Sequence, residues 1–177
     1  MGRVRFTRPV QLEGSMTVDG FSSGQRFVDD WYARRARYAK ERGSAVVYVT
    51  HREGADPGTE PPAGFYTLSS ASVERDLISG GWLKRNSPSQ IPVILLGVLG
   101  VDSRYQGSGL GSMLLNDASR RSLAIADSLG AKALVVDPVD ESASAFYARY
   151  GFKRIPGMDR MFVPLARRRE VPKTKED

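Results

Sequence analysis

Three glycines within a short segment are the first residues in this chain whose spacing points to chemistry. Gly107, Gly109 and Gly111 lie in the stretch YQGSGLG, between the apolar run IPVILLGVLGV and the helical pattern SMLLNDASRRSLAIADSLG. Glycine has no Cβ and adopts positive φ freely, so such a segment lets a ligand approach the backbone closely. Beside a helix N-terminus, it can bind an anionic group through its N–H groups. A tight turn without a ligand is the alternative that stays open.

Two common nucleotide-binding motifs fit this segment poorly. The strand before it is the fourth predicted strand rather than the first, and no acidic residue ends a later strand where the ribose of a dinucleotide would be held. The sequence GSGLG also lacks the Lys-Ser/Thr of a nucleotide P-loop. The sequence therefore disfavours both motifs.

Few side chains are available for other kinds of catalysis. The chain has no cysteine and one histidine, His51, which excludes a cysteine-ligated metal site and argues against a Ser-His-Asp triad. We expect His51 to lie at the surface, at the end of a strand. Asp137, Asp140 and Glu141 follow a short buried strand, and we interpret them as helix caps or solvated carboxylates. No general base is evident.

The hydrophobic pattern predicts the elements that must position these residues. Helices are expected at residues 25–42, from the glycine segment to about residue 129, and at 141–151. Strands are expected in VRFTRPVQLE (an edge strand, because proline cannot donate to a ladder), SAVVYVTHR, FYTLSSASVE, IPVILLGVLGVD, KALVVDPV, FKRI and MFVPLA. This order predicts a mixed α/β sheet with helices on both faces, in one domain over residues 1–166. Residues 167–177 are charged, and we expect a disordered tail.

Two glycines interrupt the central strand, and the first helix has two distinct faces. Gly97 and Gly100 indicate a bulge or a close approach, either to a ligand or to a packed helix. On the helix at 25–42, the expected buried face comprises Phe27, Val28, Trp31, Tyr32, Tyr38 and Ala39. The opposite face carries Arg26, Arg34, Arg37 and Lys40.

The overall composition is that of an ordinary globular protein with a modest positive charge. Of 177 residues, 41% are hydrophobic and 26% are charged, with a formal net charge of +6. Such a charge favours polyanions only where the basic residues are concentrated. No apolar stretch reaches the roughly 18 residues of a transmembrane helix, and no signal-peptide core is present, so we expect a cytoplasmic protein without a membrane partner.

Two segments, in this order, resemble the GNAT acetyltransferases. VDSRYQGSGLGSMLL is similar to their acetyl-CoA signature Gln/Arg-x-x-Gly-x-Gly/Ala, and AFYARYGFKRI is similar to their second segment, Phe-Tyr-x-x-x-Gly-Phe. The resemblance implies a GNAT fold, with a mixed, mostly antiparallel central sheet, splayed central strands and helices on both faces. It also implies acetyl-CoA as the acetyl donor, whose diphosphate the glycine segment would hold.

The resemblance assigns roles to particular residues. The pantetheine arm is expected to bond to the backbone of the central strand. Tyr147 is expected to protonate the thiolate that acetyl transfer expels, with Phe146 packing inward beside it and Tyr150 serving only in packing. The residues expected to bind acetyl-CoA are Leu99, Gly100, Val101, Gln106, Gly107, Ser108, Gly109, Leu110, Gly111, Ser112 and Phe146.

The N-terminal part resembles a narrower group, the GNAT toxins of type II toxin–antitoxin modules. FSSGQRFVDDWYARRARYAKERGSAVVYV is similar to their opening segment, with Ser23-Gly24, Asp29-Asp30 and Trp31 in matching positions. Such toxins acetylate the α-amine of aminoacyl-tRNA, are held inactive by a ribbon-helix-helix antitoxin, and are commonly homodimers. The resemblance therefore implies a tRNA-binding surface. Its expected residues are Arg26, Arg34, Arg37, Lys40, Lys84, Arg85 and Arg104.

Two other functions stay open at this point. A GNAT enzyme of another kind would acetylate a small-molecule amine or a protein N-terminus. A non-catalytic module would keep acetyl-CoA for structure or regulation, although Tyr147 and the complete glycine segment argue against it. The missing general base does not decide between them, because an acceptor amine of low pKa, such as an aminoacyl ester, enters the site already neutral.

Overall fold

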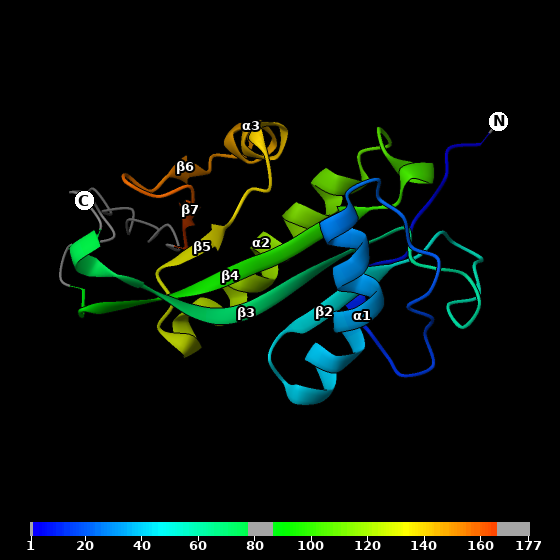
Figure 1. Cartoon of the computed structure of the whole chain (residues 1–177), viewed down its shortest axis with the longest axis horizontal. Coiled ribbons are helices and arrows are strands. Elements are labelled where there is room, and N and C mark those ends of the chain that lie inside the picture. Colours follow the sequence, from blue (N-terminus) through cyan, green and yellow to red (C-terminus); the bar gives the residue numbers. More distant parts are fainter. Residues whose placement is uncertain (1, 78–86, 166–177) are drawn as a thin grey trace, which may run out of the picture.

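A single sheet of seven strands forms the centre of the computed structural model, which describes residues 2–77 and 87–165 (Figure 1). The strand order is β1-β2-β3-β4-β5-β7-β6; the β4–β5 pair is parallel and the other pairs are antiparallel. The strands are β1 (Val10–Gln11), β2 (Val46–Thr50), β3 (Gly64–Glu74), β4 (Gln90–Val101), β5 (Ala133–Val136), β6 (Lys153–Arg154) and β7 (Met161–Pro164). The predicted tail at 167–177 lies outside the described residues.

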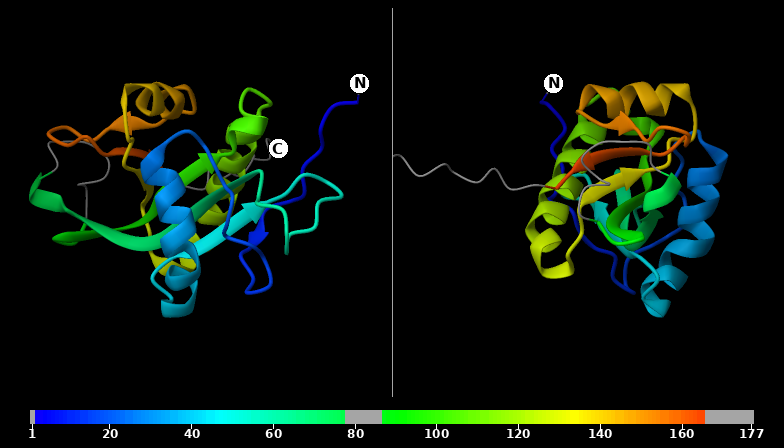
Figure 2. Two further views of the ribbon diagram at one scale, coloured as in Figure 1. Left: turned by 45° about the vertical axis from the view of Figure 1, so that its right-hand side comes forward. Right: turned by 90° about the vertical axis from the view of Figure 1, so that its left-hand side faces the viewer.

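Helices cover both faces of this sheet. Figure 2 shows α1 (Arg26–Arg42) and α2 (Leu110–Leu129) on opposite sides of the strands, with α3 (Glu141–Arg149) following β5. Two short 3-10 turns, η1 (Arg75–Leu77) and η2 (Ser103–Tyr105), complete the described elements. Within 2–77 and 87–165, no helix combines the length and the hydropathy needed to cross a bilayer. The predicted mixed, mostly antiparallel sheet with helices on both faces is confirmed.

The two central strands separate partway along their length. β4 pairs with β5 only where Ile94–Leu96 lies beside Leu134–Val136. Beyond that point β4 continues to Val101, while the chain after β5 turns away toward α3 (Figure 1). The backbone of Leu99–Val101 is paired with β3 on one side, and no strand of the described residues lies on the other. The splayed strands that the GNAT resemblance implied are therefore present.

A β-bulge marks the place of this separation. In the β3–β4 ladder the register shifts at Thr67, so that this one residue lies opposite both Gly97 and Val98. The backbone N–H of Val98 donates a hydrogen bond to Thr67 Oγ1 at 3.0 Å, which replaces the missing ladder bond. Bulges bend a strand and increase its twist, so this bulge directs the end of β4 away from β5. The bulge predicted from Gly97 is confirmed.

The buried face of α1 differs from the predicted one. Val28, Tyr32, Ala36 and Ala39 are buried against the sheet. Phe27 and Tyr38, which we had expected on that face, are 62% and 52% exposed. Val28, Tyr32 and Ala39 of the predicted face are buried as expected, so the buried stripe is displaced toward Ala36 and away from the two exposed rings.

Gly100 is what allows α1 to lie so close to β4. An added Cβ there would lie 2.6 Å from Val28 Cγ1 and 3.0 Å from Phe65 Cε1. We therefore expect Gly100→Ala to lower the free energy of unfolding by about 1–3 kcal/mol, as overpacking does, measured by urea denaturation. Gly14→Ala is the matched control, because its Cβ would meet no atom within 4 Å. Equal losses in the two variants would contradict this packing role.

His51 was predicted at the surface, and that prediction is wrong: its side chain is 4% exposed. The N-terminal segment folds over the end of β2. The backbone N–H of Thr7 donates to the His51 carbonyl at 2.9 Å, and the N–H of His51 donates to Thr7 Oγ1 at 3.0 Å. Burial lowers the pKa of His51, against a smaller opposing effect of Glu60, so the ring is neutral near pH 7.

Candidate functional site

The glycine segment forms a turn that leaves its backbone open. Gly107 and Gly109 have φ of 77° and 86°, a left-handed conformation that other L-residues rarely adopt. A Cβ at either position would meet no atom within 4 Å, so the space above the turn is free. The positive φ values explain why the turn requires glycine, and the open space leaves room for a ligand beside the turn and the start of α2 at Leu110.

Hydrogen bonds of Asp102 and Gln106 fix this turn to the segment before α1. Asp102, 2% exposed, accepts from the N–H of Ser22 at 3.2 Å and from the N–H and Nε of Arg104 at 3.0 and 2.9 Å. The Gln106 Nε2 group donates to the carbonyls of Ser23 at 2.6 Å and Val101 at 3.0 Å. Burial acts to raise the pKa of Asp102, but the hydrogen bonds from Arg104 and Ser22 outweigh it and the pKa is lowered. The sequence analysis did not single out Asp102.

A cavity of about 230 Å³ brings the predicted residues of the two GNAT-like segments together. Its walls include the end of β4 at Leu99–Val101, the side chain of Gln106, and Phe146 and Tyr147 of α3. The start of α1 supplies Gln25 and Val28. The unpaired edge of β4, Gln106 at the start of the glycine segment, and Tyr147 thus meet at one cavity, although they are far apart in the sequence. The glycines of that segment are not among the residues that line it.

Tyr147 occupies the junction between this cavity and a smaller one of about 50 Å³ beside the bulge at Gly97 and Val98. Its side chain is 8% exposed, and burial raises the pKa of its phenol to about 12. No hydrogen bond to its hydroxyl is found among residues 2–77 and 87–165. The group therefore remains protonated at neutral pH and is free to donate its proton.

The expected orientation of Phe146 is wrong. Tyr147 lies in the core, with its ring centroid 5.4 Å from that of Phe152, whereas Phe146 is half-buried at the surface of the core. The Phe146 ring contacts both Tyr147 and Tyr150, with centroids 5.3 and 5.2 Å apart. Consecutive helical residues point in directions about 100° apart, and the packing of α3 directs the second of the pair inward.

The carboxylates near the cavity are already engaged. Asp137 forms a bidentate pair with Arg160, at 2.8 and 2.9 Å. Asp140 caps α3 by accepting from the N–H of Ala143 at 2.7 Å, and it also accepts from Gln25 Nε2 at 3.4 Å. Asp140 is therefore a helix cap, as expected, whereas Asp137 is ion-paired with Arg160 and is neither a cap nor a free solvated carboxylate. The arrangement offers a proton donor in Tyr147 and no unpaired carboxylate from either aspartate.

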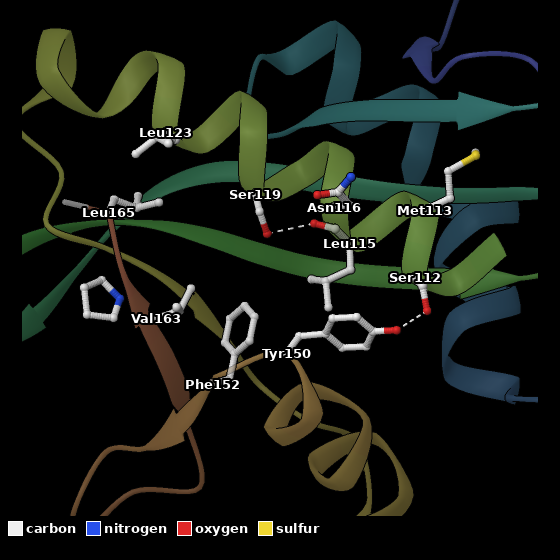
Figure 3. Close-up of a pocket in the computed structure, with 11 residues that line it drawn as sticks. Ser112, Met113, Leu115, Asn116, Ser119, Leu123, Tyr150, Phe152, Val163 and Leu165 are labelled. Atoms are coloured by element: carbon white, nitrogen blue, oxygen red, sulfur yellow. Dashed lines mark hydrogen bonds between the residues drawn. The ribbon is translucent and has the colours of Figure 1, made fainter. Parts of the chain in front are cut away.

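The remaining residues of the predicted acetyl-CoA set lie at the start of α2. Leu110 is buried in the core, so only its backbone faces the turn. Gly111 lies beneath Phe146, whose Cζ would be 3.8 Å from an added Cβ. Ser108 donates to the Tyr105 carbonyl, and the hydroxyls of Ser112 and Tyr150 share a hydrogen bond (Figure 3). Tyr150, expected only to pack, therefore also has a polar partner.

A larger groove, of about 640 Å³, lies between α2 and β7 (Figure 3). It begins at Ser112 and Tyr150 and runs past Leu115 and Phe152 to Leu165. Among residues 2–77 and 87–165, its lining is mostly apolar and contains no charged side chain or histidine. The side chain suited to proton transfer is Tyr147, so the cavity of about 230 Å³ that it lines is the candidate active site.

The predicted basic residues of α1 are all exposed, but they differ in their contacts. Arg26 lies 3.7 Å from Asp30, and Arg37 donates to the Met16 carbonyl at 2.9 Å. Arg34 and Lys40 have no ion pair within the described ranges. Arg104 is bound to Asp102 and is part of the turn. Lys84 and Arg85 lie outside the described residues.

Comparisons with known proteins agree with this geometry. Residues 70–154 match the acetyltransferase (GNAT) domain model. A tRNA-acetylating toxin from Mycobacterium tuberculosis is 38% identical over 151 residues, which cover 85% of this chain and 87% of the toxin. The structure of AtaT complexed with acetyl-methionyl-tRNAfMet is similar, with a TM-score of 0.80, 22% identity and coverage of 90% and 95% of the two chains. A tyrosine-to-phenylalanine mutant of AtaT, bound to the C-terminus of the antitoxin AtaR and acetyl-CoA, has a TM-score of 0.70, 21% identity and coverage of 91% and 94%.

Proposed function

Because this chain belongs to the GNAT acetyltransferase family, we propose that it uses acetyl-CoA to acetylate the α-amine of aminoacyl-tRNA and thereby blocks translation. The observation that carries the proposal is the meeting of three features at one cavity. These are Gln106 at the start of the open glycine turn, the unpaired edge of β4 at Leu99–Val101 and the buried phenol of Tyr147. The identity to a tRNA-acetylating toxin supports the choice of acceptor.

The geometry of the turn and of β4 fits the donor. A diphosphate needs several N–H groups at short range, and the turn at Gly107 and Gly109 offers them with free space above. The free backbone of Leu99–Val101 would hold the extended arm by hydrogen bonds, as a neighbouring strand would. Acetyl-CoA supplies an acetyl group already activated as a thioester.

Tyr147 is the proposed general acid. As the amine attacks the carbonyl carbon, the new C–N bond forms, the C–S bond breaks and its electron pair goes to sulfur. The Tyr147 hydroxyl has no other hydrogen-bond partner within the described ranges, so it can give its proton to that sulfur. The proton that leaves the nitrogen returns to the phenolate or to solvent, which restores the enzyme.

The engaged carboxylates favour an acceptor that arrives neutral. Asp137 is held by Arg160 and Asp140 by the cap of α3, so neither is free to take a proton from an ammonium group. An aminoacyl ester has an amine of low pKa and needs no such base, whereas a lysine or polyamine amine is protonated at pH 7. This difference supports aminoacyl-tRNA over small basic amines.

Transfer of labelled acetyl to a pool of charged tRNA tests the proposal directly. The purified protein should label aminoacyl-tRNA and leave deacylated tRNA unlabelled, because the ester-linked amine is the acceptor. Expression of the protein should arrest growth. Labelling of free amines or protein N-termini, with none on charged tRNA, would favour the alternative acetyltransferase and overturn the choice of acceptor.

We propose that exposed basic residues of α1 contact tRNA phosphates. The double reversal Arg34→Glu and Arg37→Glu should raise the KM for aminoacyl-tRNA about tenfold or more, with a reduced dependence on salt, because each lost phosphate contact weakens an electrostatic complex. Acetyl-CoA affinity, measured by calorimetry, should not change. Arg34 is the cleaner of the two positions, since Arg37 also donates to the Met16 carbonyl.

The matched control reverses two exposed charges on other elements, Arg120→Glu on α2 and Lys153→Glu on β6. The change in net charge is the same, but α2 covers the opposite face of the sheet (Figure 2). An equal loss of tRNA acetylation in the control would show a general charge effect and contradict the proposed surface.

The proposal extends to partners, location and domain structure. A ribbon-helix-helix antitoxin and a second copy of the chain are the proposed protein partners; the AtaT complex with the C-terminus of AtaR supports an antitoxin in general terms. Because charged tRNA is the substrate, we propose that the enzyme acts in the cytoplasm. The one continuous sheet supports a single domain over residues 1–166.

A further inference from the structure

One side of α1 presents aromatic rings to solvent. Phe27, Trp31 and Tyr38 are spaced i, i+4 and i+11, which places them on one stripe of the helix. Phe27 and Tyr38 are largely exposed. Trp31 is half-buried and stacks on Phe65, with ring centroids 6.0 Å apart and planes 10° apart. Packing against Phe65 accounts for the position of Trp31, whereas Phe27 and Tyr38 are exposed and no core contact accounts for theirs.

These rings line a groove between α1 and the sheet, of about 340 Å³, which we call the aromatic groove. Its floor is the bulged part of the sheet, including Thr67, Gly97 and Val98. Phe27, Gly97 and Val98 also line the small cavity on which Tyr147 borders. The groove therefore adjoins the place of acetyl transfer, on the side away from the glycine turn.

The surroundings of the aromatic groove are basic. Arg35 lines it, and the Arg42 guanidinium lies over the Tyr38 ring, 5.1 Å from the centroid. Neither arginine has an ion pair within the part of the chain that the structure describes. Two acids of the helix are engaged elsewhere, since Asp29 accepts from Ser23 and Asp30 lies near Arg26; the third, Glu41, is exposed. Arginine beside exposed rings is the combination that binds unpaired nucleotides.

We infer that the aromatic groove holds the unpaired 3′-terminal nucleotides of the acceptor, with the last base against Phe27, a preceding base against Tyr38 about three helical turns away, and phosphates near Arg35 and Arg42. This inference rests on the proposed function. An aminoacyl group is esterified to the terminal ribose, so the site of the last nucleotide must begin where the site of the amine ends. Phe27 lines both the aromatic groove and the small cavity beside Tyr147. Aromatic stacking tolerates any aminoacyl group, because the ring contacts the nucleotide and not the amino acid.

Tyr38→Ala tests the inference, because Tyr38 lines the groove but not the cavity beside Tyr147. We expect kcat/KM for aminoacyl-tRNA to fall about tenfold, mainly through KM, which is the effect of one lost stacking contact. Acetyl transfer to the methyl ester of the same amino acid, which has no nucleotide, should keep its wild-type rate. Tyr38→Phe keeps the ring and should restore tRNA acetylation.

Three results would overturn the inference. Unchanged acetylation of tRNA by Tyr38→Ala is the first, and an equal loss with tRNA and methyl ester is the second. The third would show that the groove is a protein–protein interface: Tyr38→Ala dissociates an oligomer in sedimentation experiments and leaves the KM for tRNA unchanged. Failure of the proposed function is a separate result, seen when the wild-type protein acetylates the methyl ester but no charged tRNA.

Discussion

Tyr147→Phe should lower kcat for acetyl transfer by about 100- to 10,000-fold, the range in which a general acid contributes. The change removes only the hydroxyl, which has no hydrogen-bond partner in the described ranges, so the core packing against Phe152 remains. The dissociation constant of acetyl-CoA and the free energy of unfolding should therefore stay near their wild-type values. Single-turnover acetylation of charged tRNA measures the loss, and growth arrest should be relieved.

The pH dependence gives a second measure of the same role. A proton donor loses activity as the pH rises through its pKa, and burial raises that of Tyr147 to about 12. Activity should therefore persist up to about pH 11, instead of falling near the usual phenol pKa of about 10. Toward acid pH, activity should fall as the acceptor amine becomes protonated.

Tyr150→Phe is the matched control for Tyr147→Phe. Tyr150 follows α3 directly, is exposed, and loses only its bond with Ser112 when the hydroxyl is removed. The kcat of the Tyr150→Phe variant should remain close to the wild-type value. Equal losses in the two variants, or growth arrest that persists in Tyr147→Phe, would mean that the phenol of Tyr147 is not the proton donor.

Gly109→Val should abolish useful binding of acetyl-CoA, with a dissociation constant raised about 100-fold or more, because the N–H groups of the turn are misplaced. Gly109 has φ of 86°, and a β-branched residue there forces the turn to rearrange. The open space around its Cβ position shows that the first effect is backbone strain, with obstruction of the ligand added to it. Calorimetry with acetyl-CoA measures the loss.

Gly130→Val separates strain from the loss of the binding site. Gly130 caps the other end of α2 with φ of 70°, and its Cβ position is also open. Both variants should lose a similar free energy of unfolding, about 1–2 kcal/mol, because both place a side chain in the left-handed region. Only Gly109→Val should lose acetyl-CoA. Weakened binding in Gly130→Val would show that the loss follows from general destabilisation.

The sequence by itself determined the features that depend on a few neighbouring residues. The alternation of apolar residues predicted the strands, and glycines ended α1 at Gly43 and α2 at Gly130. The pair Gly107 and Gly109 predicted a turn with positive φ and an exposed backbone. Steric limits on φ and ψ and the period of the hydrophobic pattern act locally, so a single sequence is sufficient to reveal them.

The tertiary structure alone decided which distant residues meet. It buried His51 under the N-terminal segment, paired Asp137 with Arg160, and used Gly100 to seat α1 on β4. That seating turned Phe27 and Tyr38 outward and formed the aromatic groove. These outcomes depend on the shapes of surfaces brought together from separate parts of the chain. Gly100 indicated that something approaches β4 closely, but it left open whether that was a ligand or a helix. Hydrophobic periodicity records that a face is buried but not which partner buries it, so no local pattern decided these contacts.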